Sequence, residues 1–398
     1  MAPDRGDDVA DTIPGDVTTS ATIAVGGTVS GTLETGPDHD WFRIDLAAGQ
    51  TITINLDGTG GTPPDTYLRL RNSAGTEIAF DDDGGPGYNS ALQFTATAAG
   101  TYFIDVGSFG DSESGTYQLS VVGSAPLPVY TNDQVAAQLI DGYWASVAES
   151  PRHFDVAPGG TLDVNITGLT AEGQFLARQA LALWSDVTGI AFHEVSTAAD
   201  INFDDANSGA YNQSTTSGGF IIVSDVNIGL DWIDPTLGGY GFELNSYSFQ
   251  TYIHEIGHAL GLGHAGNYNS DADYVTDAIY ANDGWPTTVM SYFDQNNSFY
   301  FQSRGFSNFF AVTPMAADIL AVSQMYGTPA TTRTGNTTYG FASTAGRDIF
   351  NAALNPDVAY TIFDSGGVDT LNYSGFGTVQ KIDLRAETFS NVGSGIGN

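Results

Sequence analysis

Three of the six histidines lie within eleven residues, in the stretch YIHEIGHALGLGHAGNY. His254 and His258 are four residues apart, and His264 follows six residues later. Side chains at i and i+4 share one face of a helix, so the first two can present imidazole nitrogens to one metal ion. Glu255 is turned about 100° from His254, near enough to act on a water molecule bound to that ion. The spacing therefore predicts a catalytic metal site.

The elements around this stretch are predicted to bring the three histidines together. Ser246 or Ser248 can cap a helix that runs to about Leu260. Gly261 favours the left-handed conformation that ends a helix, and a chain reversal there would return His264 to the metal. The apolar side chains of this helix fall on the face away from the histidines: Phe249, Tyr252, Ile256, Ala259 and Leu260.

The pattern HExxHxxGxxH is specific, because five fixed residues rarely occur together by chance in a chain of this length. It resembles the zinc motif of the metzincin metallopeptidases. That resemblance implies a tight turn around a methionine beneath the metal, and TVMSYF supplies Met290. It also implies that Tyr292 ligates zinc in the resting enzyme and then hydrogen-bonds the oxyanion. The alternative is that Tyr292 is a core residue behind the turn.

The resemblance to the serralysin branch of the metzincins extends well beyond the motif. It is carried by YTNDQVAAQLIDGYW, TGLTAEGQFLARQALALWSDVTGI, FQTYIHEIGHALGLGHAGNYN, TVMSYF and VTPMAADILAVSQMYG. It implies an α+β zinc peptidase domain over residues 130–328. TTRTGNTTYGF and IFDSGGVDTLNYSG resemble the start of that family's calcium-binding β-roll or β-sandwich region, which residues 329–398 would begin.

Two features depart from the serralysin pattern. The family usually starts with a short propeptide, whereas this chain carries a further domain there. The family also continues into GGxGxDxUx repeats and a secretion signal, whereas this chain stops at GSGIGN after a degenerate GGVDT. We therefore expect the sequence to be truncated.

The chemistry implied by the motif is peptide hydrolysis. One zinc ion held by neutral His254, His258 and His264 would leave a fourth position for water, whose pKa the ion lowers. Glu255 would take the proton of that water and pass it to the leaving amine. We expect an extended substrate to pair antiparallel with the strand at Gly219–Val223, which would give broad specificity.

Structural calcium is the second cofactor that the serralysin resemblance implies. The matching positions are Arg333, through its backbone carbonyl, with Gly335, Thr337, Asp364, Gly366, Gly367, Asp369 and Glu387. The alternative is that the aspartates are ordinary turn residues. The segment FDDDGG, Phe80–Gly85, with Asn89 offers another group of oxygen ligands, but an exposed acidic turn explains it equally well.

The chain is predicted to be multidomain. Residues 1–21 form an N-terminal tail, and residues 22–122 alternate apolar and polar residues in short runs such as TITINL, which predicts an all-β sandwich of about eight strands. That stretch resembles the bacterial pre-peptidase C-terminal family. GSAPLPV, residues 123–129, has the composition of a linker.

Other elements of the peptidase region can be predicted from local signals. Thr170 can cap a helix that ends at Gly189, and a second helix is expected from Pro314, behind Thr313, to Gly327. The run GGFIIVSDVNI between them is predicted to be a strand.

Composition limits the possible partners. The formal charge is −35 with only 11 Lys and Arg residues, so nucleic acid is excluded as an expected partner. The chain has no cysteine, its N-terminus contains no apolar signal sequence, and no segment is long and apolar enough to span a membrane. Secretion to the extracellular space would use a route independent of a signal peptide. Proteins and peptides are the expected partners as substrates, and a proteinaceous inhibitor is a further candidate.

Two other functions compete with peptide hydrolysis. A calcium-dependent surface or adhesion protein could keep a peptidase-like scaffold, and a zinc hydrolase could act on something other than peptides. Glu255 argues against the first, because it ligates nothing and has no structural reason to accompany the histidines. Met290 and Tyr292 argue against the second. The oligomeric state is not predicted.

Overall fold

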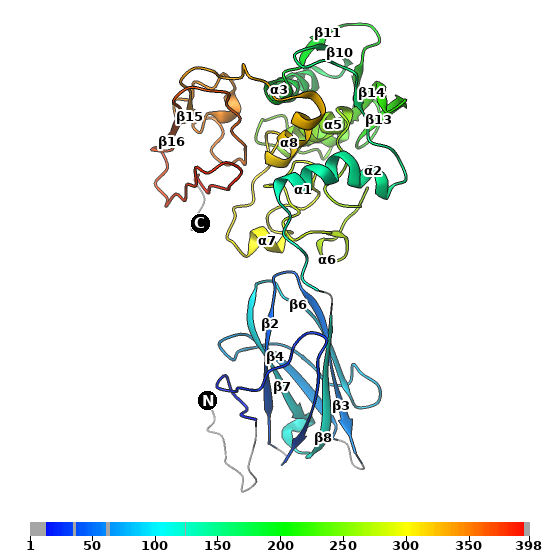
Figure 1. The fold of residues 1–398 in the computed structure, drawn as a ribbon, viewed down its shortest axis with the longest axis vertical. Helices are drawn as coiled ribbons and strands as arrows, with labels where there is room; N and C mark the ends of the chain where they lie inside the picture. Colours follow the sequence, from blue (N-terminus) through cyan, green and yellow to red (C-terminus); the bar gives the residue numbers. More distant parts are fainter. Residues whose placement is uncertain (1–12, 35–36, 61–63, 124, 394–398) are drawn as a thin grey trace. The chain divides into compact units, whose positions relative to one another are not determined.

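The structure is a computed structural model that describes residues 13–34, 37–60, 64–123 and 125–393. The chain forms two compact units, Met1–Leu127 and Pro128–Asn398, which Figure 1 shows in sequence colours. The predicted N-terminal tail falls outside the described residues up to position 12, as do Ser124 of the predicted linker and the last five residues.

The first unit consists of two four-stranded antiparallel sheets, with strand orders β1-β8-β3-β6 and β2-β7-β4-β5. The predicted sandwich of about eight strands is confirmed. The strands are β1 (Thr28–Leu33), β2 (Asp40–Leu46), β3 (Thr51–Thr59), β4 (Thr66–Arg71), β5 (Glu77–Asp81), β6 (Ser90–Thr95), β7 (Gly100–Ser108) and β8 (Gly115–Gly123).

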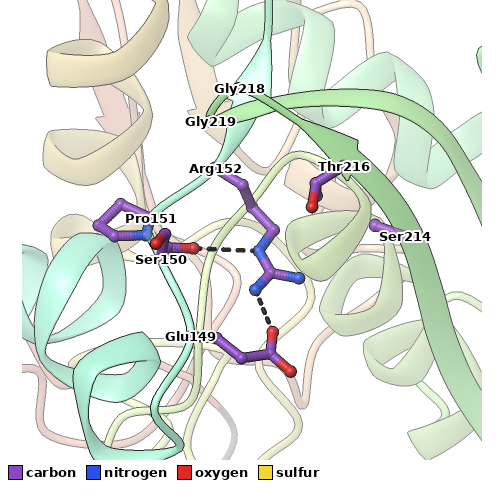
Figure 2. Close-up of a pocket in the computed structure, with 8 residues that line it drawn as sticks. All are labelled: Glu149, Ser150, Pro151, Arg152, Ser214, Thr216, Gly218 and Gly219. Atoms are coloured by element: carbon purple, nitrogen blue, oxygen red, sulfur yellow. Dashed lines mark hydrogen bonds and ion pairs between the residues drawn. The ribbon is translucent and has the colours of Figure 1, made fainter.

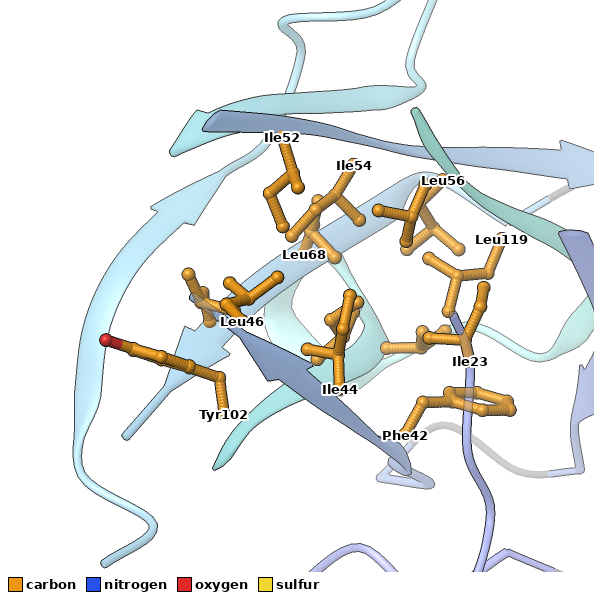
Figure 3. Packing of buried hydrophobic residues seen from close by; sticks show 14 of the residues in the cluster. Ile23, Phe42, Ile44, Leu46, Ile52, Ile54, Leu56, Leu68, Tyr102 and Leu119 are labelled. Atoms are coloured by element: carbon orange, nitrogen blue, oxygen red, sulfur yellow. The ribbon is translucent and has the colours of Figure 1, made fainter. Parts of the chain in front are cut away.

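Alternation along these strands builds a core between the two sheets (Figure 3). Ile52, Ile54 and Leu56 of β3 are completely buried, and their polar neighbours in the sequence face outward. Leu68 of β4 and Ile44 of β2 meet them from the other sheet. The first unit therefore buries an apolar core of its own.

The second unit is built on a sheet whose main order is β11-β10-β12-β14-β13, with the short β9 paired to β14. All of its pairings are parallel except the antiparallel pair of β13 and β14. The strands are β9 (His153–Phe154), β10 (Thr161–Gly168), β11 (Ala191–Glu194), β12 (Ile201–Asp204), β13 (Ala210–Ser217) and β14 (Phe220–Ile228). The predicted strand GGFIIVSDVNI is confirmed as β14.

The edge of this sheet differs from the prediction. Residues Phe220 and Ile221 pair with β13 on one side and with β9 on the other, so the segment 219–223 has no free edge for a substrate. The outer strand of the described sheet is β13. The prediction was wrong because, in the hairpin of β13 and β14, the first strand, β13, forms the edge of the sheet and β14 lies inside it.

Helices α3 (Ala171–Thr188) and α5 (Tyr247–Ala259) pack against this sheet. The other helices of the unit are α1 (Asn132–Ala137), α2 (Tyr143–Ser146), α4 (Leu230–Ile233), α6 (Tyr274–Asp277), α7 (Phe299–Gln302) and α8 (Ala316–Tyr326). The predicted ends of α3 are confirmed, with Thr170 as N-cap and Gly189 left-handed at φ 73°. No helix in the described part of the chain is long and apolar enough to cross a membrane.

The expected start of α8 at Pro314 was wrong by two residues. The helix begins at Ala316, because the Asp318 carboxylate accepts a hydrogen bond from the Met315 backbone N–H at 2.8 Å and caps the helix there. Its predicted end at Gly327 is confirmed.

The C-terminal region has little regular structure. In the described residues after α8, one parallel pair of short strands forms, β15 (Thr338–Gly340) with β16 (Thr370–Asn372). Asp186, in the last turn of α3, receives ion pairs from Arg333 and Arg347. These contacts join the region to the helices of the same unit.

Candidate metal centre

Helix α5 carries the first two histidines and is fixed at both ends. Ser246, not Ser248, is its N-cap, and its Oγ accepts a hydrogen bond from the Phe249 N–H at 3.2 Å. The helix ends before Gly261, whose φ is +106°. A Cβ at Gly261 would lie 2.0 Å from the Arg152 carbonyl oxygen. Both the positive φ and this close approach therefore require glycine at position 261.

The turn at Gly261 brings the third histidine back to the first two. Candidate ligand nitrogens of His254, His258 and His264 all lie within 4.8 Å of one another. The Nε2 atoms of His258 and His264 are 3.0 Å apart. Tetrahedral ligands at about 2.1 Å from a zinc ion lie about 3.4 Å from each other, so the three imidazoles fit one zinc ion.

Backbone carbonyls set the orientation of two imidazoles. His254 Nδ1 lies 2.8 Å from the Val289 carbonyl oxygen, and His258 Nδ1 lies 2.8 Å from the Leu262 carbonyl oxygen. A carbonyl only accepts, so each Nδ1 must carry the proton and each Nε2 keeps its lone pair. The Nε2 lone pairs of His254 and His258 are therefore free to bind a metal ion.

Burial keeps this cluster neutral. It lowers the pKa of His254 to about 4 and that of His258 to about 3, and it lowers the pKa of His264 well below the ordinary value. Neutral imidazole is the form that binds a metal ion. The histidines are thus ready to ligate at neutral pH without first losing protons.

Glu255, also on α5, is buried beside this cluster and is not one of the three candidate ligands. Its Oε2 has no hydrogen-bond partner among the described residues. Burial raises its pKa to about 8. A carboxyl group with a pKa near the working pH is suited to take and return a proton.

The turn around Met290 supports α5 from below. A Cβ on Gly257 would lie 2.7 Å from Met290 Sδ. The methionine therefore packs against α5 at a position that has no side chain. Asp318 of α8 holds this turn by accepting hydrogen bonds from the Val289 N–H at 2.8 Å and from the Thr288 hydroxyl. Asp318 was missed in the sequence, although a lone acidic residue in an apolar helix was the available signal.

Tyr292 lies at the histidine cluster, as the motif predicted. Its ring centroid is 4.7 Å from that of His264 and 6.0 Å from that of His254. The side chain is only partly buried, which disfavours the alternative of a core tyrosine.

Comparisons with known proteins agree with this arrangement. The C-terminal residues 328–398 match the family described as peptidase M10 serralysin C terminal. Serralysin of Proteus mirabilis is 36% identical over 235 residues, which cover 54% of this chain and 47% of that protein. Metallopeptidase AprA of Pseudomonas marginalis is 34% identical over 335 residues, which cover 76% of this chain and 67% of that protein. The chain belongs to the serralysin family of metallopeptidases.

Further matches cover other parts of this chain. Residues 38–108 match the bacterial pre-peptidase C-terminal domain, and residues 235–315 match peptidase M66. Metalloprotease AprA of Pseudomonas entomophila is 34% identical over 68% of this chain and 60% of that protein, so the chain spans about half to two thirds of these relatives. The solved structure of myroilysin covers 43% of this chain and 95% of that chain at 21% identity, with a TM-score of 0.29.

A second buried hydrogen-bond network of this chain, around Asp283, was also missed in the sequence. Asp283 is completely buried and accepts hydrogen bonds from the Tyr268 hydroxyl at 3.1 Å and the Ser291 hydroxyl at 2.6 Å. The Tyr292 N–H donates to the Tyr268 hydroxyl at 3.4 Å. Burial raises the pKa of Asp283 to about 7. In the sequence, Asp283 in ANDGW looks like an ordinary turn residue.

Most of the predicted calcium positions meet in two touching loops. The Thr337 N–H donates to Asp369 Oδ1 at 2.9 Å, and a Cβ on Gly367 would lie 2.4 Å from the Gly335 carbonyl oxygen. Arg333 adopts φ +52° in the first loop, and Asp364 in the second accepts from the Gly366 N–H at 3.0 Å.

Glu387 behaves differently from the other predicted calcium ligands. Its carbonyl and carboxylate oxygens each lie 3.5 Å from Nδ2 of Asn132 in α1. No hydrogen bond in the described part of the chain joins it to the two loops.

The acidic segment of the first unit divides between two roles. Asp81 Oδ1 accepts hydrogen bonds from the Gly84 and Ala91 N–H groups, so this aspartate closes the turn. Asn89 Oδ1 accepts from the Gly58 N–H. Asp82 and Asp83 instead approach Asp65, with carboxylate oxygens of the three within 4.8 Å. Acidic side chains often gather at a surface without an ion, which is the alternative that the sequence left open.

Proposed function

We propose that this serralysin-family chain is a secreted zinc endopeptidase that hydrolyses extracellular proteins with broad specificity. The observation that carries the proposal is the convergence of three neutral imidazoles on one point, with Glu255 buried beside them. His254, His258 and His264 would hold the ion. A scaffold without activity has no use for a buried carboxyl group that bonds to nothing in the described chain.

Each residue of the site has a defined part in peptide hydrolysis. When bound, zinc lowers the pKa of water and polarises the substrate carbonyl. Glu255 accepts the proton of the attacking water and returns it to the leaving amine. Tyr292 donates a hydrogen bond to the oxyanion that develops on the carbonyl oxygen. The carbonyl oxygens of Val289 and Leu262 keep two imidazoles oriented throughout.

The outer strand β13 is where an extended substrate would bind. It pairs only with β14 among the described strands, and α5 packs against it. Pairing through the backbone satisfies any peptide whatever its side chains, which accounts for broad specificity. This assignment replaces the segment 219–223, which is paired on both sides.

Calcium would bind between the two touching loops. The proposed ligands are the backbone and side-chain oxygens of Arg333, Gly335, Thr337, Asp364, Gly366, Gly367 and Asp369, a set of hard oxygen donors of the kind that calcium takes. The support is that separate segments of the C-terminal region meet at these positions.

Glu255→Gln tests the catalytic proposal. The variant should retain one zinc ion and lose peptide hydrolysis by at least about a thousandfold, because the substitution removes the base and no ligand. Metal content and cleavage of casein measure the two effects. Glu172→Gln, at an exposed glutamate in the first turn of α3, is the matched control and should keep full activity. Wild-type protein that binds zinc and cleaves no protein or peptide would instead favour the scaffold function.

A further inference from the structure

A pocket of about 470 Å³ lies beside the outer strand of the sheet (Figure 2). One wall is the second half of β13 with the hairpin that follows it, and the other is the segment between α2 and β9. The lining is mainly polar: Glu149, Ser150, Pro151, Arg152, Ser214, Thr216, Gly218 and Gly219. This pocket could not be predicted from the sequence, because its two walls are more than sixty residues apart in the chain.

Arg152 is the fixed cation of this pocket. Its guanidinium lies 3.8 Å above the ring of Trp144, and its Nε donates to the Ser150 carbonyl oxygen at 3.4 Å. Its Nη2 donates to the Glu149 carboxylate, as the dashed line in Figure 2 marks. The Arg152 side chain is 12% exposed and the Glu149 side chain 52% exposed, so the arginine is the buried partner and the glutamate the solvent-exposed one.

The pocket shares its supports with the metal centre. Trp144 Nε1 donates to the Gly261 carbonyl oxygen at 3.0 Å, and the Arg152 carbonyl oxygen packs directly on Gly261. Gly261 lies three residues from both His258 and His264. The neighbouring Tyr143 ring lies 4.9 Å from the His264 ring. A ligand in the pocket is therefore held by the same turn that places two of the proposed zinc ligands.

A substrate on β13 would send a side chain into this pocket. Ser214 and Thr216 line it, and they are two residues apart, so they project from the same face of the strand. Residues directly opposite each other on paired strands also project to the same face. A substrate residue opposite Ser214 or Thr216 would thus point its side chain at Arg152.

We propose that this pocket is a substrate subsite that selects an acidic side chain, aspartate or glutamate, through Arg152. The inference rests on the proposed endopeptidase function. A substrate carboxylate can take the place of Glu149 on the guanidinium while Glu149 turns into water, where it is already half exposed. The guanidinium stays paired throughout, through a charge-assisted hydrogen bond of the kind that gives specificity.

A cationic substrate side chain would be disfavoured by the same contacts. It would have to draw Glu149 away from Arg152, which would leave a guanidinium with 12% exposure without its anion. The pair is only partly buried, since Glu149 is half exposed, but separating it still costs more than separating a fully exposed pair because the arginine is buried. The hydroxyl groups of Ser150 and Thr216 can also donate to a carboxylate, whereas that of Ser214 already donates to Asn212 Oδ1. None of the three adds a negative charge for a cation.

A peptide series with one varied residue tests the proposal. Each peptide carries Glu, Gln or Lys at one position on either side of a common scissile bond, and kcat/KM is measured for wild type, Arg152→Gln and Glu149→Gln. Wild type should prefer Glu over Gln by about tenfold at one position, as expected for one hydrogen bond to a charged group. Arg152→Gln should abolish that preference, measured as the ratio of kcat/KM for the Glu and Gln peptides, and Glu149→Gln should increase it.

Two controls separate the subsite from general effects of charge and folding. Arg178→Gln removes an exposed cation of α3 that pairs with Glu194 of β11. Neither residue lines the pocket, so the preference should stay intact. Arg152→Lys keeps the charge and should restore part of the preference lost in Arg152→Gln, and thermal melting of all variants shows whether they fold.

The outcomes distinguish this inference from the proposed function. A Glu preference of equal size in wild type and Arg152→Gln, or a Lys preference that disappears in Glu149→Gln, would overturn the subsite while hydrolysis remained. Peptide affinity of Glu255→Gln, measured by fluorescence anisotropy, gives a readout without turnover. If wild type cleaved no peptide, tighter binding of the Glu peptide that depends on Arg152 would still support the subsite, and equal binding would overturn it.

Discussion

At the scale of single residues, the metal centre depends on groups that burial has made neutral. Burial lowers the pKa of His254 to about 4 and raises that of Glu255 to about 8, so neither group favours its charged form at neutral pH. The neutral imidazoles therefore carry no charge that would repel a divalent cation, which we propose they bind. To act as a base Glu255 must be ionised, and a cation bound beside it would favour that form by lowering its pKa.

The spacing of residues predicted the parts of this centre that are close in the sequence. His254, His258 and Glu255 are fixed by one helix, so their relation follows from 3.6 residues per turn. Asp283 and Asp318 were missed because their partners are supplied by the folded chain. Asp283 meets Tyr268 fifteen residues earlier, and no local pattern distinguishes it from a turn aspartate.

Asp283→Asn tests whether this buried carboxyl positions Tyr292, the tyrosine proposed for catalysis. Asparagine offers one acceptor oxygen in place of two, and its amide would face the Ser291 and Tyr268 hydroxyls, which now donate. Tyr268 would then hold the Tyr292 backbone less firmly. We expect kcat on a short peptide to fall about tenfold, with KM and zinc content unchanged and stability lower by about 1–3 kcal/mol.

Two further variants make that test specific. Tyr268→Phe should lower kcat similarly, and the double variant should lose less than the product of the two effects, because both residues act on Tyr292 through one path. Asp271→Asn, at an exposed aspartate of the same segment, is the control. A change in melting temperature with no change in kcat would assign Asp283 to stability alone.

At the scale of elements, caps were predictable and strand neighbours were not. Thr170, Ser246 and Gly261 act within a few residues of their own position, so their types alone mark where helices begin and end. Which strand lies at the edge is decided by pairing across the sheet. The hairpin of β13 and β14 places β13 outside, and only the folded topology shows this.

The two calcium loops give a prediction at the same scale. In the Glu255→Gln background, which prevents self-digestion, removing calcium with a chelator selective for it should open residues 328–393 to added protease while zinc stays bound. Without a cation, the carboxylates of Asp364 and Asp369 keep hydrogen bonds, such as those from the Tyr339 hydroxyl to Asp364 and from the Thr337 N–H to Asp369, but lose the positive charge that we propose lies between the loops.

Mass spectrometry of the fragments locates the new cuts. Restored protection on adding calcium, but not magnesium, is expected because calcium accepts a larger and more flexible set of oxygen ligands. Identical digestion with and without calcium would show that hydrogen bonds alone hold the loops, among them the contacts of Arg333 with Asp186 and with the Phe363 carbonyl oxygen.

At the scale of the whole molecule, the chain divides into units that each bury their own core. The boundary that the contacts give, between Leu127 and Pro128, falls inside the linker predicted from composition. Alternating strands identified the first unit because each strand needs only its own pattern to show which face is buried. Its role is a matter for experiment, and every residue proposed for catalysis or metal binding lies in the second unit.

Removing residues 1–124 should therefore leave catalysis intact. The segment that starts the second unit is anchored within that unit. The Ala281 N–H donates to the Pro128 carbonyl oxygen at 2.8 Å, and the Tyr130 ring stacks on that of Tyr280 with centroids 4.6 Å apart. We expect the shortened chain to bind zinc and to cleave a short peptide within about twofold of the rate of the full chain.

A deeper truncation is the matched control for that experiment. Removing residues 1–131 also deletes both anchors and the side chain of Thr131, which caps α1, so it should lower stability by about 2 kcal/mol or more. Equal melting temperatures for the two truncations would show that these contacts stabilise nothing. A shorter chain that cleaved the small peptide many times faster than the full chain would make the first unit an inhibitor. If the 1–124 deletion did not fold, the boundary at Leu127 would be wrong, because the second unit would then depend on residues that the present division assigns to the first.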